Sequence, residues 1–314
     1  MHLLSVLDLD VKETVFLAAA AKSNPAKYAK AIAGKSVVTL YEKPSTRTKI
    51  SFELAAKEMG AHVIDLPNAH LKSKHEDVFD SAKTISQYAD LFAARVYSHE
   101  FLAEFSQYSE IPVVNLLSDE EHPCQALADM LTISEHCGLE GTKVAFVGDS
   151  NNVCNSLMLA CASAGVDFAV ASPEGFLPGE KFLGKAKQLA GASKSKLEVS
   201  SDPFKAVENA DAVYTDVWVS MGQESEAKEK LAAFAGFEVT QELMAHAASQ
   251  AVFMHCLPAQ KGVEVEKSVI EGLQSVVFAQ AGNRVHAQKA VLLALIGEQE
   301  LKQKLMQGIA LEEA

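Results

Sequence analysis

The chain alternates between two patterns of hydrophobic and polar positions. Short runs of β-branched and apolar residues predict buried strands, and segments with apolar residues three and four positions apart predict helices. The run from Ser36 to Tyr41 is of the first kind. A helix predicted to start near Ser45 is of the second kind, with an apolar face made of Phe52, Ala55, Ala56 and Met59. Strands that alternate with helices are typical of α/β folds with a mostly parallel sheet.

This alternation continues along the chain and restarts near residue 143. Further strands are predicted at residues 61–66, 89–97, 111–116, 143–147, 167–171, 212–215, 251–254 and 276–278. Helices are predicted at about residues 123–136, from about Asn152 onward, and from Arg284 to about Gln307. A chain of 314 residues is too long for one core. We therefore predict two domains, each a mostly parallel β-sheet flanked by helices: residues 1–132 plus a C-terminal helix over 285–314, and residues 133–284.

Composition narrows the classes of function. Hydrophobic residues make up 48% and charged residues 22% of the sequence, as in ordinary soluble proteins. The formal net charge of -13 argues against a nucleic-acid binder, and a phosphate site would need a local concentration of cations. The five cysteines are scattered without the spacing of a zinc site, so we expect reduced thiols in a cytoplasmic protein. We expect neither a signal peptide nor a membrane-spanning segment.

The most informative stretch is Ser45-Thr46-Arg47-Thr48, which follows a predicted strand and begins a helix. A helix N-terminus attracts anions through its unpaired N–H groups and its dipole. Hydroxyl groups add donors, and an arginine can bind two phosphate oxygens at once. Without a ligand, the same residues would form an ordinary N-cap in which Ser45 pairs with Thr48.

A second group of polar residues is His122-Pro123-Cys124-Gln125, with a proline suited to the first position of a helix. Its imidazole and amide could point to the carboxyl ends of the strands, where ligands bind in open α/β sheets. By itself, His122 would more often be a capping or packing residue. Arg95, at the end of a strand, and Arg284, at the start of the last predicted helix, are further candidates.

The second half of the sequence carries its own polar clusters. Asp216 follows an apolar strand, and its carboxylate could accept hydrogen bonds from an ammonium group. The turn Ser220-Met221-Gly222 could hold a carboxylate with its N–H groups, or the whole region could be a turn around a buried tryptophan. Cys256 lacks a nearby residue that would activate it as a nucleophile, so we favour a role for its backbone carbonyl.

The segment Gly148-Asp149-Ser150-Asn151-Asn152 lies at a strand-to-helix turn of the kind that dinucleotide sites use. It lacks the Gly-x-Gly-x-x-Gly pattern, which disfavours NAD and an oxidoreductase. Asparagines at this turn fit hydrogen bonding to a small polar substrate.

Together and in this order, these clusters resemble the aspartate/ornithine carbamoyltransferase family over essentially the whole chain. Ser45-Thr46-Arg47-Thr48 is similar to the family's carbamoyl-phosphate motif, and His122-Pro123-Cys124-Gln125 is similar to its second signature. Asp216 with Ser220-Met221-Gly222, and His255-Cys256-Leu257-Pro258, resemble the ornithine branch. The aspartate branch lacks the Ser-Met-Gly turn.

The resemblance implies a role for each cluster. The phosphate would be held by Ser45, Thr46, Arg47 and Thr48. The carbamoyl carbonyl and the bridging oxygen would be surrounded by Arg95, His122 and Gln125, with Arg284 completing the pocket. The carbamoyl NH2 would donate to the backbone carbonyls of Cys256 and Leu257. The amino acid would be held by Asn152, Asp216, Ser220 and Met221.

The same resemblance implies a reaction and an assembly. The neutral side-chain amine of L-ornithine would attack the carbamoyl carbon of carbamoyl phosphate, and phosphate would leave. Neither a metal nor an organic cofactor is implied. Since the amine must lose its proton, activity is expected to rise towards alkaline pH. Family members form trimers, so a homotrimer or a multiple of trimers is expected, and we predict a role in arginine biosynthesis, with arginine breakdown as the alternative.

Three features depart from the family pattern. Lys49 stands where arginine is usual, and Gly282 stands where glutamate is usual. The loop over residues 69–77 is basic but lacks the usual glycine and the glutamate-serine pair. Two alternatives therefore stay open: a carbamoyltransferase for another amine, such as putrescine or a modified ornithine, and a non-catalytic paralogue that only binds.

Overall fold

The computed structural model describes residues 1–67, 77–219, 227–298 and 301–303. The chain divides into two compact units. Unit 1 consists of Met1–Leu131 with Gly282–Ala314, and unit 2 consists of Thr132–Ala281. The chain passes from one unit to the other within helix α6 (Pro123–His136) and near the start of helix α13 (Val277–Ile296).

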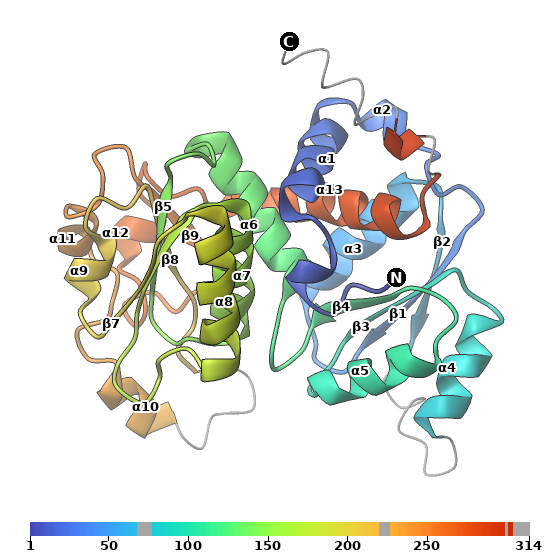
Figure 1. The fold of residues 1–314 in the computed structure, drawn as a ribbon, viewed down its shortest axis with the longest axis horizontal. Helices are drawn as coiled ribbons and strands as arrows, with labels where there is room; N and C mark the ends of the chain where they lie inside the picture. The colour runs from blue at the N-terminus through green and yellow to red at the C-terminus, as the bar shows by residue number, and fades with distance from the viewer. Residues whose placement is uncertain (68–76, 220–226, 299–300, 304–314) are drawn as a thin grey trace. The chain divides into compact units, whose positions relative to one another are not determined.

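Unit 1 is built on a parallel four-stranded sheet in the order β2-β1-β3-β4. Its strands are β1 (Ser36–Tyr41), β2 (His62–Leu66), β3 (Leu91–Arg95) and β4 (Val113–Leu117). Its helices before α6 are η1 (Val6–Asp8), α1 (Val11–Ser23), α2 (Pro25–Tyr28), α3 (Thr46–Glu58), α4 (Val78–Ser86) and α5 (His99–Tyr108). Helices α4 and α5 lie on one face of the sheet and α3 lies on the other (Figure 1).

Unit 2 repeats this plan with a parallel five-stranded sheet in the order β7-β6-β5-β8-β9. Its strands are β5 (Lys143–Val147), β6 (Asp167–Ala171), β7 (Leu197–Ser200), β8 (Ala212–Thr215) and β9 (Val252–His255). Its helices are α7 (Asn152–Ala164), α8 (Glu180–Ser193), α9 (Pro203–Val207), α10 (Ala227–Ala233), α11 (Gln241–Met244) and α12 (Lys267–Ile270).

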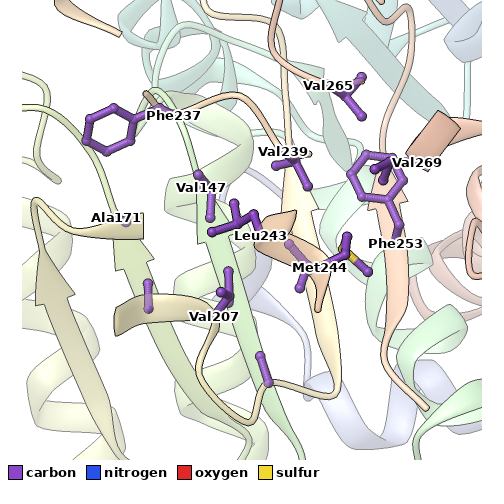
Figure 2. Packing of buried hydrophobic residues seen from close by; sticks show 14 of the residues in the cluster. Val147, Ala171, Val207, Phe237, Val239, Leu243, Met244, Phe253, Val265 and Val269 are labelled. Atoms are coloured by element: carbon purple, nitrogen blue, oxygen red, sulfur yellow. The ribbon is translucent and has the colours of Figure 1, made fainter. Parts of the chain in front are cut away.

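Each sheet packs a cluster of buried apolar side chains against neighbouring helices. In unit 1, apolar side chains of β1, β3 and β4 pack against α4 and α5, with Phe92 stacked on Phe105 at 4.3 Å between ring centroids. In unit 2, side chains such as Val147 on β5 and Phe253 on β9 pack against Leu243 and Met244 of α11 (Figure 2). Burial of these side chains is the main favourable term that holds each unit together.

The strand order creates a switch point in each sheet. In unit 1 the chain leaves β1 toward β2 on one side and returns to β3 on the other. In unit 2 the corresponding neighbours are β5 and β8. Loops that leave such neighbours diverge, and a crevice forms at the carboxyl ends of the strands, where α/β proteins bind ligands. The loops that follow β1, β3, β5 and β8 are therefore the places to search for a site.

The predicted fold class, two domains with mostly parallel sheets flanked by helices, is confirmed. The strand predicted at residues 276–278 is wrong, because α13 begins at Val277. The backbone of Val276 still donates to Phe253 of β9, but the next residues turn into the helix. Arg284 consequently lies inside α13 and not at its start. The short edge strand β7 was missed because two of its four residues are polar.

Candidate functional site

Three segments of unit 1 meet at the carboxyl edge of its sheet. The β1–α3 loop brings Ser45, β3 ends at Arg95, and the loop after β4 ends at His122 just before α6. Because Tyr41 is the register partner of Arg95 in neighbouring strands, the first two segments leave the sheet side by side. The sheet thus assembles residues that are far apart in the sequence.

The α3 N-terminus is capped as its sequence predicts. Ser45 has extended backbone angles, and its Oγ accepts a hydrogen bond from the Thr48 backbone N–H at 3.2 Å. Thr46 is exposed and Arg47 is half-buried in the first turn. A capped helix N-terminus with an arginine beside it is a favourable place for an anion.

The Thr48 side chain joins two arginines. Its Oγ1 accepts from Nη2 of Arg284 at 2.9 Å and from Nη1 of Arg95 at 3.4 Å. All three residues are buried, with 1%, 3% and 9% of the surface of Thr48, Arg284 and Arg95 exposed. Two guanidinium groups therefore converge on one neutral hydroxyl in a region of low dielectric, where their field on a bound anion is strong.

Arg284 also contacts the residues that precede and begin α6. Its Nη1 donates to Oε1 of Gln125 and lies 3.5 Å from Nε2 of His122. The His122 carbonyl accepts from the backbone N–H groups of Gln125 and Ala126, as expected of a residue placed just before a helix. Arg95, Arg284, His122 and Gln125, predicted from separate parts of the sequence, thus lie close together around Thr48.

The His122 imidazole is neutral in the folded protein. Burial lowers its pKa well below the ordinary value of 6.5, and the charges of Arg284 and Arg95 lower it further. A neutral imidazole can donate one hydrogen bond and accept another, which suits a group placed next to a polar substrate atom.

The use of arginine in this chain is selective. The sequence has 28 basic residues, of which three are arginines, Arg47, Arg95 and Arg284. All three belong to unit 1, and two of them meet at Thr48. Only arginine presents a planar fork that matches a phosphate or carboxylate. The scarcity of arginine, with all three arginines in unit 1, is therefore a signal for the site that is visible in the sequence without any motif.

Lys49, where the family usually has arginine, is engaged at the surface. Its Nζ pairs with Asp65, lies 3.9 Å from Glu53, and sits 5.2 Å from the centre of the Tyr41 ring. Its side chain is 43% exposed, so these contacts are screened by water. In the structure, Lys49 in the first turn of α3 therefore pairs with acidic side chains of β2 and of the next turn of α3.

In unit 2 the polar residues at the carboxyl edge of the sheet centre on Asp216, which follows β8 and is 6% exposed. Its Oδ2 accepts from Nδ2 of Asn151 at 2.8 Å, and its Oδ1 accepts from the thiol of Cys256 at 3.1 Å. Asn151 is also the N-cap of α7, where its Oδ1 accepts from two backbone N–H groups. The helix cap thereby holds the carboxylate in place.

The segment from His255 to Leu257 is fixed by a buried network. The Leu257 backbone N–H donates to Nδ1 of His255 at 2.8 Å, so the proton of the neutral ring is on Nε2, which faces Glu264 at 3.3 Å. The backbone N–H of His255 donates to Gln280. Leu257 has a φ of +59°, a left-handed conformation that a leucine seldom adopts without such support. The network sets the direction of the carbonyls in this loop.

Asp216, His255 and Cys256 could each offer one ligand to a metal ion, since these ligand atoms lie within 4.8 Å of one another. Hydrogen bonds already use both nitrogens of His255 and both oxygens of Asp216. A metal ion bound by the His255 ring would have to displace one of the two hydrogen bonds of that ring.

The β5–α7 turn packs tightly against the segment after β8. Gly148 has a φ of +136°, and a Cβ there would lie 3.2 Å from both the Thr215 hydroxyl and the Trp218 indole nitrogen. Glycine is thus required at residue 148 for both conformation and space.

The next residue, Asp149, pairs with Lys230 of α10 at 2.6 Å. The pKa of the Asp149 carboxyl is raised, because burial and the Asp216 carboxylate together outweigh the lowering effect of the Lys230 ammonium.

Some predicted site residues lie outside the described residues, namely Ser220, Met221 and Gly222, and residues 69–76 of the basic loop. Asn152 is the first residue of α7 and is half-buried. The roles predicted for Asn152, Cys256 and Leu257 stay predictions. Among the residues of these contacts, Asp129 and Lys230 were not predicted from the sequence, and Asn151 was named only as one of the asparagines of the turn after β5. Asn151 was detectable as a helix cap, and Asp129 by its position one helical turn after Gln125.

Comparison with known proteins agrees with this geometry. Residues 1–135 match the family profile described as aspartate/ornithine carbamoyltransferase, carbamoyl-P binding domain. Residues 140–295 match the profile described as aspartate/ornithine carbamoyltransferase, Asp/Orn binding domain. The two profiles together cover most of the chain.

Individual relatives are similar over most of their length. The anabolic ornithine carbamoyltransferase of Pyrococcus furiosus is 48% identical over 266 residues, which is 84% of each chain. A solved structure of ornithine carbamoyltransferase from Pyrococcus furiosus superimposes with a TM-score of 0.90 at 44% identity, covering 94% of this chain and 96% of that one. Acetylornithine transcarbamylase complexed with acetylcitrulline gives a TM-score of 0.85 at 28% identity, over 95% of this chain and 100% of that one.

Proposed function

Because the chain belongs to the aspartate/ornithine carbamoyltransferase family, we propose that it transfers the carbamoyl group of carbamoyl phosphate to L-ornithine. The products are L-citrulline and phosphate. The protein is an enzyme of the carbamoyl-transferring kind, as its relatives are. The observation that carries the proposal is the convergence of Arg95 and Arg284 on the Thr48 hydroxyl, beside the capped N-terminus of α3.

Unit 1 carries the donor side of the proposal. The phosphate binds at the α3 N-terminus to Ser45, Thr46, Arg47 and Thr48. The carbamoyl group lies against Arg95, His122, Gln125 and Arg284. The cationic forks suit a dianion, and the neutral His122 can donate to a carbonyl oxygen without adding charge. The strongly acidic chain thus concentrates its arginines where an anionic substrate needs them.

Unit 2 carries the acceptor side. Asp216, held by Asn151 and Cys256, binds an ammonium group of ornithine, and Asn152, Ser220 and Met221 contribute to binding the amino acid. A carboxylate that is 6% exposed gains most from a cationic ligand, since a buried negative charge is costly without a partner.

The chemistry follows from charge. The neutral side-chain amine of ornithine attacks the carbamoyl carbon, and the carbonyl oxygen becomes an oxyanion. The bond from carbon to the bridging oxygen then breaks, phosphate leaves with the electron pair, and the proton released by the attacking nitrogen is taken up by this phosphate, which departs as hydrogen phosphate. The preorganised guanidinium groups of Arg95 and Arg284 stabilise the negative charges that develop on the carbonyl oxygen and on the leaving phosphate. A well-placed donor contributes about 3 kcal/mol to this stabilisation.

The identity of the acceptor separates the proposal from its alternatives. One structural neighbour is an acetylornithine transcarbamylase, so a modified ornithine is a chemically reasonable acceptor, as is putrescine. Putrescine lacks the carboxylate and the α-amine, and N-acetylornithine lacks the α-ammonium that Asp216 is proposed to bind. A non-catalytic paralogue would turn over none of these amines.

We further propose that the protein works as a homotrimer or a multiple of trimers. The outer strand β2 exposes Ile64, and the adjoining helix α3 exposes Ile50 and Leu54 one turn apart, at 47%, 60% and 41%. Exposed apolar side chains on a helix and on an open sheet edge are costly in water, and further copies of the chain would cover them. Sedimentation equilibrium gives the assembly mass directly.

A role in arginine biosynthesis is proposed because a relative at 48% identity is named as the anabolic enzyme. A cytoplasmic location is proposed because five scattered cysteines fit a reducing compartment. None of the helices among the described residues is long and apolar enough to span a bilayer.

The proposal is tested by phosphate release from carbamoyl phosphate in the presence of ornithine, N-acetylornithine, putrescine or aspartate. We expect ornithine to give the highest kcat/KM. The variant Lys289→Met is the control for folding, because Arg284 and Lys289 are both buried cations of α13. Lys289 pairs with Glu58 at 2.5 Å and not with the residues around Thr48. Arg284→Met should lose about 100-fold to 1000-fold in kcat, while Lys289→Met keeps it. Equal losses, or no turnover of any amine by the wild type, would contradict the proposal.

A further inference from the structure

Asp129 is a buried carboxylate in the interior of α6, with no exposed surface. One helical turn earlier, Gln125 donates from its Nε2 to Oδ1 of Asp129 at 2.8 Å. On its other side, Gln125 accepts from Arg284 through its Oε1. The Gln125 amide thus bridges a carboxylate and a guanidinium group, and both belong to unit 1.

These two partners fix which way the amide points. An ionised carboxylate can only accept hydrogen bonds, and a guanidinium group can only donate them. The Gln125 NH2 group must therefore face Asp129, and its carbonyl oxygen must face Arg284. A turn of the amide by 180° would place two donors against each other at Arg284 and two acceptors against each other at Asp129.

The position of Asp129 calls for an explanation. Aspartate is a poor residue for a helix interior, and burying its charge is expensive unless hydrogen bonds compensate. A leucine or alanine at this position would suit both the helix and the core better. A carboxylate here is therefore explained by what it does for its neighbours, and one of them, Gln125, is a predicted site residue.

We propose that Asp129 is a positioning residue that locks the Gln125 amide in the orientation needed to hold Arg284 and to meet the carbamoyl group. The aligned charges also polarise the amide, which strengthens the hydrogen bond at Oε1. Asp129 itself touches no substrate. This inference rests on the proposed function, because it takes Gln125 and Arg284 as parts of the carbamoyl-phosphate site.

The inference makes a selective prediction. Without Asp129, the amide of Gln125 gains rotational freedom, and carbamoyl phosphate should bind about tenfold more weakly, equivalent to about 1.4 kcal/mol. Inorganic phosphate carries no carbamoyl group, so its inhibition constant should change by less than about twofold. A general loss of folding would weaken both ligands together.

The experiment is a double-mutant cycle on the full-length enzyme, with Asp129→Ala, Gln125→Ala and the double variant. The readouts are the KM for carbamoyl phosphate, the inhibition constant of phosphate, and the melting temperature. In the Gln125→Ala background, Asp129→Ala should change the KM by less than about twofold, because the amide on which it acts is gone. Equal effects of Asp129→Ala in both backgrounds would overturn the inference.

Two further variants make the result interpretable. Asp129→Asn keeps the volume and an acceptor oxygen, so it should recover most of the affinity. If the alanine variant does not fold, Asp129→Leu, which also removes the acceptor and suits a buried helix position, supplies the cycle. Tyr28→Phe removes a buried hydrogen bond to the Leu17 carbonyl elsewhere in unit 1, so it should lower stability without changing either ligand constant. If the wild type releases no phosphate with any amine, the proposed function fails. If the wild type is active but Asp129→Ala and Asp129→Asn keep the normal KM, only the positioning role fails.

Discussion

The Thr48 hydroxyl accepts hydrogen bonds from both Arg284, at 2.9 Å, and Arg95, at 3.4 Å, in a place where only 1% of Thr48 is exposed. Thr48→Val keeps the shape and the β-branch of the side chain and removes the acceptor. The two guanidinium groups then lose a hydrogen bond at a site that water reaches poorly.

The cost of this change follows from the two distances. A hydrogen bond to a charged group contributes about 1.5 to 3 kcal/mol, and the bond at 2.9 Å should be near the middle of that range. The contact at 3.4 Å is at the edge of hydrogen-bonding geometry and adds little. We expect a loss of about 2.5 kcal/mol, which lowers the melting temperature of a unit of this size by about 7 °C.

Thr14→Val is the matched control, because Thr14 is also buried in a helix of unit 1 and its hydroxyl donates to a neutral carbonyl, that of Asp10. It should cost about 1 kcal/mol. Thermal unfolding followed by circular dichroism compares the two, and Thr48→Ser, which keeps the hydroxyl, should recover part of the loss. If Thr48→Val were no more destabilising than Thr14→Val, the hydroxyl would not hold the two arginines as described.

Other predictions concern charge, reactivity and backbone shape. Because burial and the two arginines depress the His122 pKa below the 6.5 it has when unfolded, the unfolded chain takes up a proton first as pH falls. The free energy of unfolding should therefore decrease below about pH 6.5. Urea titrations at successive pH values should show that it depends less on pH in His122→Asn than in the wild type. Phenylglyoxal should modify Arg47 before the buried Arg95 and Arg284, and phosphate should protect Arg47 from modification. Mass spectrometry can follow all three arginines of the chain, and early modification of Arg284 would contradict its burial. Gly148→Ala should destabilise unit 2 by about 1 to 3 kcal/mol, because the new Cβ would lie against Thr215 and Trp218 at a positive φ. A urea titration followed by the fluorescence of the single tryptophan measures this loss, and an unchanged midpoint would contradict the tight packing at Gly148.

Local sequence predicted the parts of the structure that depend on local interactions. The cap at Ser45 and the presence of strand β3, predicted at 89–97 and observed at Leu91–Arg95, follow from side-chain type and hydrophobic period, which act over a few residues. The strand wrongly predicted at 276–278 marks the limit of that reasoning. Val276, Val277 and Phe278 have strand-like side chains, yet the chain turns into α13 there, with Phe278 80% exposed.

The contacts within the site could not be predicted in this way. Thr48 and Arg284 are separated by 236 positions, and no periodicity connects them. They meet because the segments after β1 and β3 leave neighbouring strands side by side, and because α13 belongs to unit 1 from Gly282 onward. The bond from Asn151 to Asp216 depends in the same way on β5 and β8 being neighbours. Sheet order is set by tertiary packing, so the sequence could name candidates but could not pair them.

The most direct test of the central claim follows the carbon atom that is transferred. The purified protein is incubated with carbon-13-labelled carbamoyl phosphate and L-ornithine, and the products are followed by NMR. The account predicts that the label appears in the ureido carbon of L-citrulline, with one phosphate released for each citrulline formed. Label that stays in carbamoyl phosphate and its spontaneous breakdown products, or that enters putrescine faster than ornithine when both are present, would contradict it.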